Sequence, residues 1–433
     1  MCGIVGYIGS RDAASVVIGG LRRLEYRGYD SAGIAVLYEN GDISVERAVG
    51  KLRNLEEKLG PTCLGCQIAI GHTRWATHGG VTEQNAHPHV GARSRVAVVH
   101  NGIIENYATL RQELASAGVI LASETDSEVV AHLVERELEP GVDLLAAVQR
   151  VLPRIQGASS FVFISPDSAD CLVAARLGNA GGIVIGVGQE ETFVASDIPA
   201  ILEHTREVLF LEHRQTARVT RDGVQIFTMD SVPVTPRLYN IPWDPVAAEK
   251  GTYRHFMQKE ISEQPRAITD TIRGRANFNL SRVELETLPL TDTEARSLQK
   301  VIIAACGTSY HAGLIGKFML ENLARIPVEI DYASEFRYRN PMIGPDTAVL
   351  AMTQSGETVD TLAAMAEGRE QGARLWTIVN VLGSQAQRIA DGYILMHAGP
   401  EIGVASTKAF TTSLVDLYLL AVALGEKRGV LAG

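Results

Sequence analysis

From about residue 291 onward, an apolar run, a turn of small residues and a helical segment follow one another three times. The three units are VIIAACGTS with SYHAGLIGKFMLENLA, AVLAMTQSGET with VDTLAAMAEGREQG, and LWTIVNVLGS with QAQRIADG. Strands that are joined through helices run parallel, and helices cover both faces of their sheet, so such strands are apolar throughout. The pattern therefore predicts a doubly wound parallel α/β domain over residues 291–433.

A chain of 433 residues is too long for one ordinary core, so two or three domains are expected. The first half shows a different pattern of strands and helices from the second half. Short β-type runs alternate with turn signals up to about residue 222, and helical stretches interrupt them, for example over 105–118 and 126–139. Strands punctuated by helices predict a layered α+β domain over residues 2–222. Residues 223–290 are polar with scattered prolines, which predicts an interdomain linker that contains one helix.

Charge and cysteine content limit the partners and the setting of the chain. The formal net charge is −10 and no cluster of Lys and Arg stands out, which argues against a nucleic-acid or anionic-membrane partner. The apolar segment 413–425 is short and contains Asp416, so we expect a buried helix rather than a membrane span. Five cysteines, an odd number, in a chain without a secretory signal predict reduced thiols and a cytoplasmic protein.

A metal site is conceivable near residue 63, because Cys63 and Cys66 form a CxxC pair close to several histidines. These histidines are His72, His78, His87, His89 and His100. A zinc site would need a second pair of ligands at matching spacing, and the sequence has none. We therefore favour loop and core histidines without a metal.

Cys2 stands directly behind the initiator methionine, in front of an apolar run. Removal of Met1 would give Cys2 a free α-amine, whose pKa is ~7.7–8.0 in model peptides. That amine could accept the thiol proton, and the thiolate is the competent nucleophile. The alternative is that Cys2 is only a small buried apolar residue.

Four further motifs favour the nucleophile. They are LEYRGYDSAG (24–33), GHTRWATHG (71–79), VHNGIIEN (99–106) and SETDSE (123–128). Together with MCGIVG, they make the first half closely similar to the N-terminal-nucleophile (Ntn) glutamine amidotransferases. The resemblance implies the αββα Ntn-hydrolase fold and glutamine as the substrate.

The resemblance also implies a role for each residue of these motifs. Asn101 and Gly102 would form an oxyanion hole, Arg74 would bind the α-carboxylate of glutamine, and Asp126 would bind its α-ammonium. Other residues would line the pocket or fix the chain terminus: Trp75, Thr77, His78 and Arg27. Taken singly, Arg74 and Asp126 could be surface ion pairs, and Asn-Gly could be an ordinary turn.

Three small-residue stretches in the second half suggest an anion site. They are CGTS (306–309), TQSGET (353–358) and EIGVASTKAFTT (401–412). Hydroxyls and backbone N–H groups at helix N-termini bind phosphate without needing many cations, although ordinary helix capping uses the same residues. The sequence shows no SGGxDS loop for ATP and no adjacent acidic pair for a diphosphate sugar.

This combination resembles the isomerising glutamine:fructose-6-phosphate aminotransferase family, whose second half consists of sugar isomerase (SIS) domains. The resemblance implies glutamine and fructose 6-phosphate as substrates, glucosamine 6-phosphate as the product, no cofactor or metal, and a homodimer in the full-length family. It also implies a set of residues that hold the sugar phosphate: Thr353, Gln354, Ser355 and Thr358, with Ser309 assisting. Three more would contact the sugar: Thr308, Val404 and Ser406.

The length of the chain departs from this family, which carries two SIS domains where the sequence has one. The missing domain should hold the groups for ring opening and isomerisation. Because the sugar-site motifs are intact, we expect a fragment of a longer gene product. The alternative is a natural short form that acts as a glutaminase joined to a sugar-phosphate-binding module.

Overall fold

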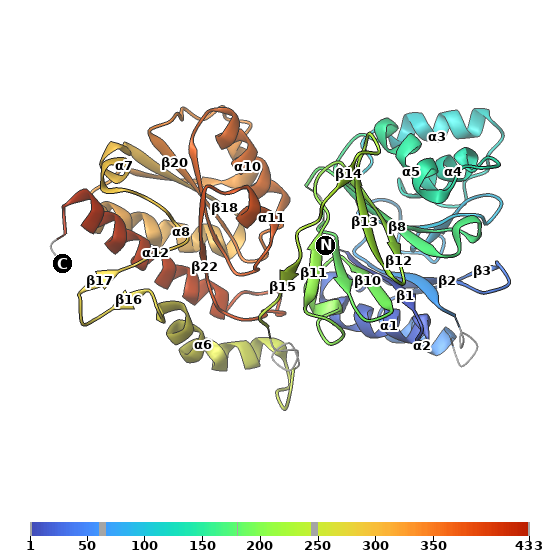
Figure 1. Ribbon diagram of the computed structural model, residues 1–433, viewed down its shortest axis with the longest axis horizontal. Coiled ribbons are helices and arrows are strands. Elements are labelled where there is room, and N and C mark those ends of the chain that lie inside the picture. Colours follow the sequence, from blue (N-terminus) through green and yellow to red (C-terminus); the bar gives the residue numbers. More distant parts are fainter. Residues whose placement is uncertain (1, 60–65, 180, 244–249, 432–433) are drawn as a thin grey trace. The chain divides into compact units, whose positions relative to one another are not determined.

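The computed structural model describes residues 2–59, 66–179, 181–243 and 250–431 (Figure 1). The chain divides into two compact units, Met1–Pro245 and Val246–Gly433. Cys63 of the CxxC pair, and Met1, lie outside the described residues.

The first unit contains two antiparallel sheets. The eight-stranded sheet has the order β15-β11-β9-β10-β1-β4-β2-β3, and the seven-stranded sheet has the order β14-β13-β12-β8-β7-β6-β5. The strands of the first sheet are β1 (Gly3–Gly9), β2 (Ser31–Leu37), β3 (Ile43–Val49), β4 (Ile68–Arg74), β9 (Val184–Val187), β10 (Glu191–Ala195), β11 (Glu207–Phe210) and β15 (Tyr239–Asn240). Those of the second are β5 (His89–Val90), β6 (Ala97–Gly102), β7 (Ser159–Ile164), β8 (Cys171–Leu177), β12 (Gln215–Thr220), β13 (Gly223–Thr228) and β14 (Pro233–Val234).

Helices cover the outer faces of these two sheets. One apolar core lies between the sheets, where side chains such as Ile4 and Ile70 meet Val99 and Val162. A second core lies between the seven-stranded sheet and three helices, α3 (Tyr107–Ser116), α4 (Glu128–Glu137) and α5 (Leu144–Val151). On the other side, α1 (Ala13–Leu24) packs on β1 and β4, and α2 (Leu52–Leu59) packs on β3. The layers are therefore αββα, as predicted.

A glycine in β4 allows α1 to approach the sheet closely. A β-carbon at Gly71 would lie 2.6 Å from Val17 Cγ1 and 2.8 Å from Leu21 Cδ1 of α1. A side chain there would push the helix away from β4, whose last residue is Arg74.

The sequence analysis assigned residues 223–240 to a linker, but this segment contains three strands. β13 and β14 belong to the seven-stranded sheet, and β15 belongs to the eight-stranded sheet. β13 is a hairpin partner of β12 near a sheet edge, and only Ile226 of β13 is buried. Such a strand lacks the strong apolar alternation of a core strand, so its sequence is typical of a linker. The boundary between the two units along the chain lies after Pro245 rather than after residue 222.

The second unit is built on a five-stranded parallel sheet with the order β19-β18-β20-β21-β22. Its strands are β18 (Lys300–Ala305), β19 (Val328–Tyr332), β20 (Thr347–Thr353), β21 (Arg374–Val379) and β22 (Gly392–Leu395). The helices of this unit are α6 (Phe256–Ile272), α7 (Asp292–Ser297), α8 (Gly307–Met319), α9 (Ala333–Phe336), α10 (Val359–Glu370), α11 (Gln385–Ile389) and α12 (Lys408–Arg428). A small hairpin of β16 (Ala276–Asn277) and β17 (Arg282–Val283) completes it.

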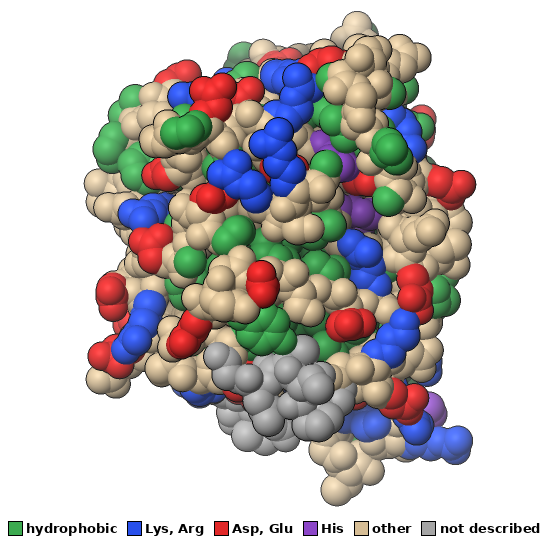
Figure 2. All heavy atoms as spheres, turned by 90° about the vertical axis from the view of Figure 1, so that its right-hand side faces the viewer, with side chains coloured by type: hydrophobic (Ala, Val, Ile, Leu, Met, Phe, Trp, Pro, Cys, Tyr) green, Lys and Arg blue, Asp and Glu red, His purple; other side chains and the backbone are tan. Residues whose placement is uncertain are grey.

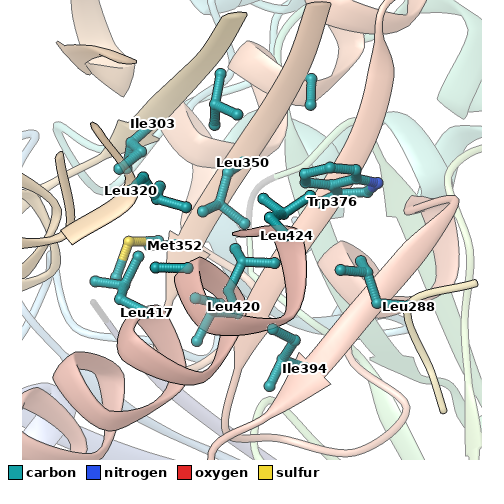
Figure 3. Close-up of a cluster of buried hydrophobic side chains, with 14 of the residues drawn as sticks. Leu288, Ile303, Leu320, Leu350, Met352, Trp376, Ile394, Leu417, Leu420 and Leu424 are labelled. Carbon is teal, nitrogen blue, oxygen red and sulfur yellow. The ribbon is translucent and has the colours of Figure 1, made fainter. Parts of the chain in front are cut away.

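Alternate residues of each central strand enter different cores, so helices cover both faces of the sheet. Ile303 of β18 joins a cluster with Leu320, Leu417 and Leu420, which Figure 3 shows around Leu350 and Met352 of β20. The neighbouring Ile302 joins the opposite cluster, which contains side chains of α9, α10 and α11. This confirms the predicted doubly wound domain.

Helix α12 is long and apolar enough to cross a membrane by length and composition alone. However, 61% of its most apolar window is buried, and Leu417, Leu420 and Leu424 face the sheet in Figure 3. The helix is thus a core element of the second unit, as the sequence predicted for residues 413–425.

Candidate functional site

Cys2 lies immediately before β1, where its thiol meets the backbone of Trp75. The Trp75 N–H donates to Cys2 Sγ at 3.2 Å, and Sγ lies 3.5 Å from the Trp75 carbonyl oxygen. Burial raises the pKa of the Cys2 thiol, and the Trp75 N–H, Arg74 and Arg27 oppose this rise without cancelling it. A thiol in this environment needs a base to become a nucleophile.

Asn101 and Gly102 end strand β6 beside Cys2. The side-chain Nδ2 of Asn101 donates to the carbonyl oxygen of Cys2 at 3.2 Å. Gly102 has φ of +135°, and a β-carbon there would overlap with the carbonyl oxygen of Ala158. Only glycine fits this position without strain, so β6 ends in an amide donor that contacts the backbone of Cys2, followed by a residue without a side chain.

Arg74 and Asp126 are both buried, at 4% and 5% exposure. The Arg74 guanidinium donates to the carbonyl oxygens of His78 and Gly80, and so holds the turn that follows β4. Burial lowers the pKa of Arg74, against the attraction of Cys2 and Asp126. The Arg74 guanidinium is therefore close enough to interact electrostatically with both the Cys2 thiol and the Asp126 carboxylate.

The other glutamine-site candidates lie on two segments. Trp75 is 44% exposed and packs edge-on against Tyr29, and the ring of His78 meets that of Tyr107 at 6.0 Å. Thr77 Oγ1 lies 3.3 Å from His78 Nδ1.

Arg27 is buried and forms an ion pair with Asp197, which also accepts a hydrogen bond from Tyr26. The sequence analysis missed Asp197, because it lies 170 residues along the chain from its partner.

Asp126 is held by groups that the sequence analysis did not assign to the site. Its Oδ2 accepts from the Ile104 N–H at 2.8 Å, and Ser127 Oγ donates to Oδ1 at 3.3 Å. Ser127 Oγ also lies 2.7 Å from His100 Nδ1, and His100 Nε2 lies 3.0 Å from Ser159 Oγ. The histidine of the HNG motif thus supports the carboxylate, while the asparagine beside it supports the nucleophile.

In the second unit, the sugar-phosphate candidates cluster at the carboxyl ends of β18 and β20. The chain passes from β18 through α8 to β19 on one side, and β20 lies on the other, so this is the point where strand order reverses. Ligands of doubly wound sheets bind at such a point. Thr308 and Ser309 lie in the first turn of α8, and Thr353 is the last residue of β20.

The TQSGET turn is a preformed loop between β20 and α10. Thr353 Oγ1 accepts from the Gly356 N–H at 3.2 Å and lies 3.0 Å from Thr358 Oγ1. Ser355 Oγ accepts from the Glu357 N–H at 3.2 Å, and the Gln354 carbonyl oxygen accepts from the Asn380 N–H at 3.1 Å. Several hydroxyls therefore gather where α10 presents its first N–H groups.

Val404 and Ser406 lie on a separate loop before α12. Val404 is 86% exposed, and Ser406 Oγ donates to Glu401 at 2.9 Å. The loop is anchored by Glu260 of α6, whose carboxylate accepts from the N–H groups of Ile402 at 2.6 Å and Gly403 at 3.0 Å. Glu260 is 2% exposed, and no sequence signal pointed to it.

Comparisons with known families match both units. The family described as SIS domain matches residues 296–423, and the one described as glutamine amidotransferase domain matches residues 72–203. The fold and the two matches define a glutamine amidotransferase of the Ntn type followed by an SIS domain.

Relatives that match the whole chain identify the family within this class. The "Glutamine--fructose-6-phosphate aminotransferase [isomerizing]" of Symbiobacterium thermophilum is 50% identical over 429 residues, which are 99% of this chain and 70% of that protein. The protein of the same name from Streptomyces coelicolor is 50% identical over 434 residues, or 100% of this chain and 70% of its own. The chain belongs to the family of isomerising glutamine–fructose-6-phosphate aminotransferases.

A solved structure, the C-terminal domain of the glucosamine-fructose-6-phosphate aminotransferase from Francisella tularensis, is 35% identical with a TM-score of 0.40. The match covers 42% of this chain and 51% of that one.

Proposed function

We propose that the first unit hydrolyses glutamine at Cys2 after Met1 has been removed. The observation that carries this proposal is the Asn101 amide, which donates at 3.2 Å to the nucleophile's own residue. Gly102, with its required backbone conformation, lies at the same strand end. Two neutral donors beside a thiol are suited to stabilise the oxyanion of a tetrahedral intermediate.

In the proposed reaction, the α-amine of Cys2 takes the thiol proton, and the sulfur attacks the side-chain carboxamide carbon of glutamine. The developing oxyanion accepts hydrogen bonds from Asn101 Nδ2 and the Gly102 N–H. The intermediate collapses to a thioester as ammonia leaves with a proton from the α-amine. Water then attacks the thioester, and glutamate leaves the regenerated thiol. Arg74 and Asp126 bind the two charged ends of the free amino acid.

We further propose that the ammonia is added to fructose 6-phosphate to give glucosamine 6-phosphate, the first step of the hexosamine pathway. The name of the two relatives at 50% identity supports this acceptor. The hydroxyls of the TQSGET turn and the first N–H groups of α10 would hold the phosphate, with Ser309 assisting. Thr308, Val404 and Ser406 would contact the sugar. We also propose a cytoplasmic enzyme that is dimeric in its full-length form.

A second candidate function is a glutaminase joined to a sugar-phosphate-binding module. The chain spans 70% of the length of the relatives that carry the aminotransferase name, so that name alone does not decide between the two candidates.

Glucosamine 6-phosphate formation and glutamine hydrolysis should be measured on this chain and on one extended at its C-terminus. Product from either chain supports the synthase, and fructose 6-phosphate binding without product from both supports the module.

Two substitutions test the division of labour. Cys2→Ala should abolish glutamine hydrolysis and leave fructose 6-phosphate binding unchanged, while Cys171→Ala, at a buried thiol of β8, should keep the hydrolysis. Ser355→Ala should weaken fructose 6-phosphate binding about 10-fold, as expected for one lost hydrogen bond to a charged group. Ser297→Ala, at an exposed serine of α7, serves as its control. Glutamine hydrolysis that survives Cys2→Ala would remove Cys2 from its role.

A further inference from the structure

Asn101 can act as an oxyanion donor only if its NH2 group, and not its carbonyl oxygen, faces Cys2. We propose that His72 of β4 is the positioning residue that fixes this orientation. His72 is fully buried, and it comes from the eight-stranded sheet, whereas Asn101 comes from the seven-stranded sheet. The proposal rests on the proposed glutaminase function and adds to it the group that prepares the oxyanion hole.

The hydrogen bonds of His72 determine which atom of the Asn101 amide it faces. His72 Nε2 lies 3.1 Å from the backbone carbonyl oxygen of His100 and 3.1 Å from Asn101 Oδ1. A backbone carbonyl only accepts, so Nε2 must carry the proton. A protonated Nε2 then needs an acceptor on Asn101 as well, which is Oδ1. The NH2 group is left at the other end, toward the Cys2 carbonyl oxygen at 3.2 Å.

The opposite orientation of the amide would create two unfavourable contacts. The NH2 group would face the Nε2–H of His72, and Oδ1 would face the carbonyl oxygen of Cys2. Two donors would face each other at one end of the amide and two acceptors at the other, and both contacts are repulsive. The amide is therefore held in one orientation before the substrate arrives.

The surroundings of His72 keep it neutral and in one tautomer. Burial lowers the pKa of His72 to about 3, and the ring of His87 stacks on it at a centroid distance of 4.2 Å. The Nδ1 atom of His72 is buried and has no hydrogen-bond partner within the described part of the chain. A proton on Nδ1 would have no acceptor, so the Nε2–H form is the one that this site stabilises.

This arrangement predicts an effect of His72 on the chemical step. An amide that no longer has a fixed orientation spends part of its time with oxygen toward the oxyanion, where it repels the developing charge. Complete loss of one oxyanion donor costs about 10²–10³ in kcat. Loss of its orientation should cost less, about 10- to 100-fold in kcat, with a KM for glutamine within about 3-fold because the Arg74 and Asp126 contacts remain.

The experiment uses glutamine hydrolysis by the complete, Met1-processed chain. His72→Phe keeps the ring volume but removes the donor, and His72→Gln keeps an N–H donor and should recover part of the loss. His204→Phe, a stacked histidine elsewhere in the same unit, is the matched control and should retain wild-type kcat. In an Asn101→Ala background, His72→Phe should change kcat by less than about 2-fold, because the group it orients is absent.

Two kinetic results would overturn the proposal. One is a wild-type kcat for His72→Phe. The other is a loss that multiplies in full with that of Asn101→Ala, since His72 would then act independently of the amide.

A spectroscopic measurement does not depend on any variant folding. In the wild-type chain labelled with ¹⁵N-histidine, His72 should give the shift pattern of the neutral Nε2–H tautomer, unchanged between pH 5.5 and 8. An Nδ1–H tautomer, or titration within that range, would refute the proposal. Absence of Cys2-dependent glutamine hydrolysis in the wild-type chain would instead refute the proposed function, so the two failures are distinguishable.

Discussion

Acidification should unfold the first unit of this protein through four buried histidines. These histidines are His72, His87, His89 and His100, and none is more than 5% exposed. Burial lowers the pKa of His72 and His89 to about 3 and that of His100 to about 4, and it places the pKa of His87 well below its ordinary value. In the unfolded chain, the same side chains titrate near about 6.5.

Between pH 7.5 and 5.5, the unfolded chain takes up protons at these four positions and the native chain does not. The free energy of unfolding therefore falls as the pH falls. The four histidines together remove about 5 kcal/mol over this interval. This loss is comparable with the whole stability of an ordinary domain, about 5–15 kcal/mol.

The most strongly shifted carboxylate of this unit contributes only at lower pH. Glu128 is buried, which opposes its ionisation, but hydrogen bonds from His132 and Ser123 hold its pKa at about 2. A carboxylate with a depressed pKa loses its stabilising effect below its unfolded pKa of about 4.3. The interval from pH 7.5 to 5.5 therefore reports on the histidines.

Hydrogen exchange followed by mass spectrometry on the complete chain measures this effect. After correction for intrinsic exchange rates, protection of β4 and β6 should fall with a slope of about four protons or slightly more near pH 5, because burial also lowers the pKa of His204 and His213 in the same unit. Strands β18 and β20 are the internal reference, because the histidines in the described part of their unit, His255, His311 and His397, are exposed. Partial burial of its ring lowers the pKa of His397, so protection of these strands should fall with a slope of at most about one proton.

One variant and its control test whether the buried histidines cause this pH dependence. His89→Phe should lower the slope by about one proton, and His311→Gln should leave it unchanged. Protection of β4 and β6 that stays constant from pH 7.5 to 5.5, or that falls equally in β18 and β20, would refute this account.

Two substitutions probe the second unit. Gly356 has φ of +70°, and a β-carbon there would overlap with Ser384 Oγ. Gly356→Ala should therefore lower the free energy of unfolding by about 1–3 kcal/mol and weaken fructose 6-phosphate binding, as measured by urea unfolding and calorimetry. Gly372→Ala, with φ of +79° and open space around it, is the control, and an equal loss in both variants would contradict the reasoning. Glu260→Gln should raise the KM for fructose 6-phosphate several-fold without changing glutamine hydrolysis, because it weakens two hydrogen bonds to the loop of Val404. Glu286→Gln, at an exposed position, is its control, and a changed rate of glutamine hydrolysis in Glu260→Gln would count against this assignment.

The central strands of the second unit could be predicted because they are buried on both faces. Each of them is an uninterrupted apolar run that ends in a turn of small residues, and this local pattern fixes both the strand and its following helix. Strand β13 could not be predicted in the same way, because its side chains are mostly half-buried and its sequence does not alternate clearly.

The candidate site also has residues that the sequence predicts and residues that it does not. Cys2, Asn101 and Arg74 stand in motifs whose chemistry can be stated from the sequence. Several groups that hold the candidate side chains and loops could not be predicted, since they make contacts between elements that are distant along the chain. Glu260 lies 142 residues from the loop it anchors, and His72 acts across two sheets. Sequence patterns indicate which groups do chemistry, but only the tertiary contacts show which groups orient them.

Strand β6 shows why the site depends on register and not only on the residues present. Neighbouring residues of a strand point to opposite faces, and here both faces are used. His100 stacks on Phe161 at 4.5 Å and supports Asp126 through Ser127, while Asn101 reaches Cys2. The pairing of His100 with Phe161 and of Asn101 with Ser160 fixes this division. A slip of one residue would exchange the two side chains, so the amide donor and the support of the carboxylate would be lost in a single step.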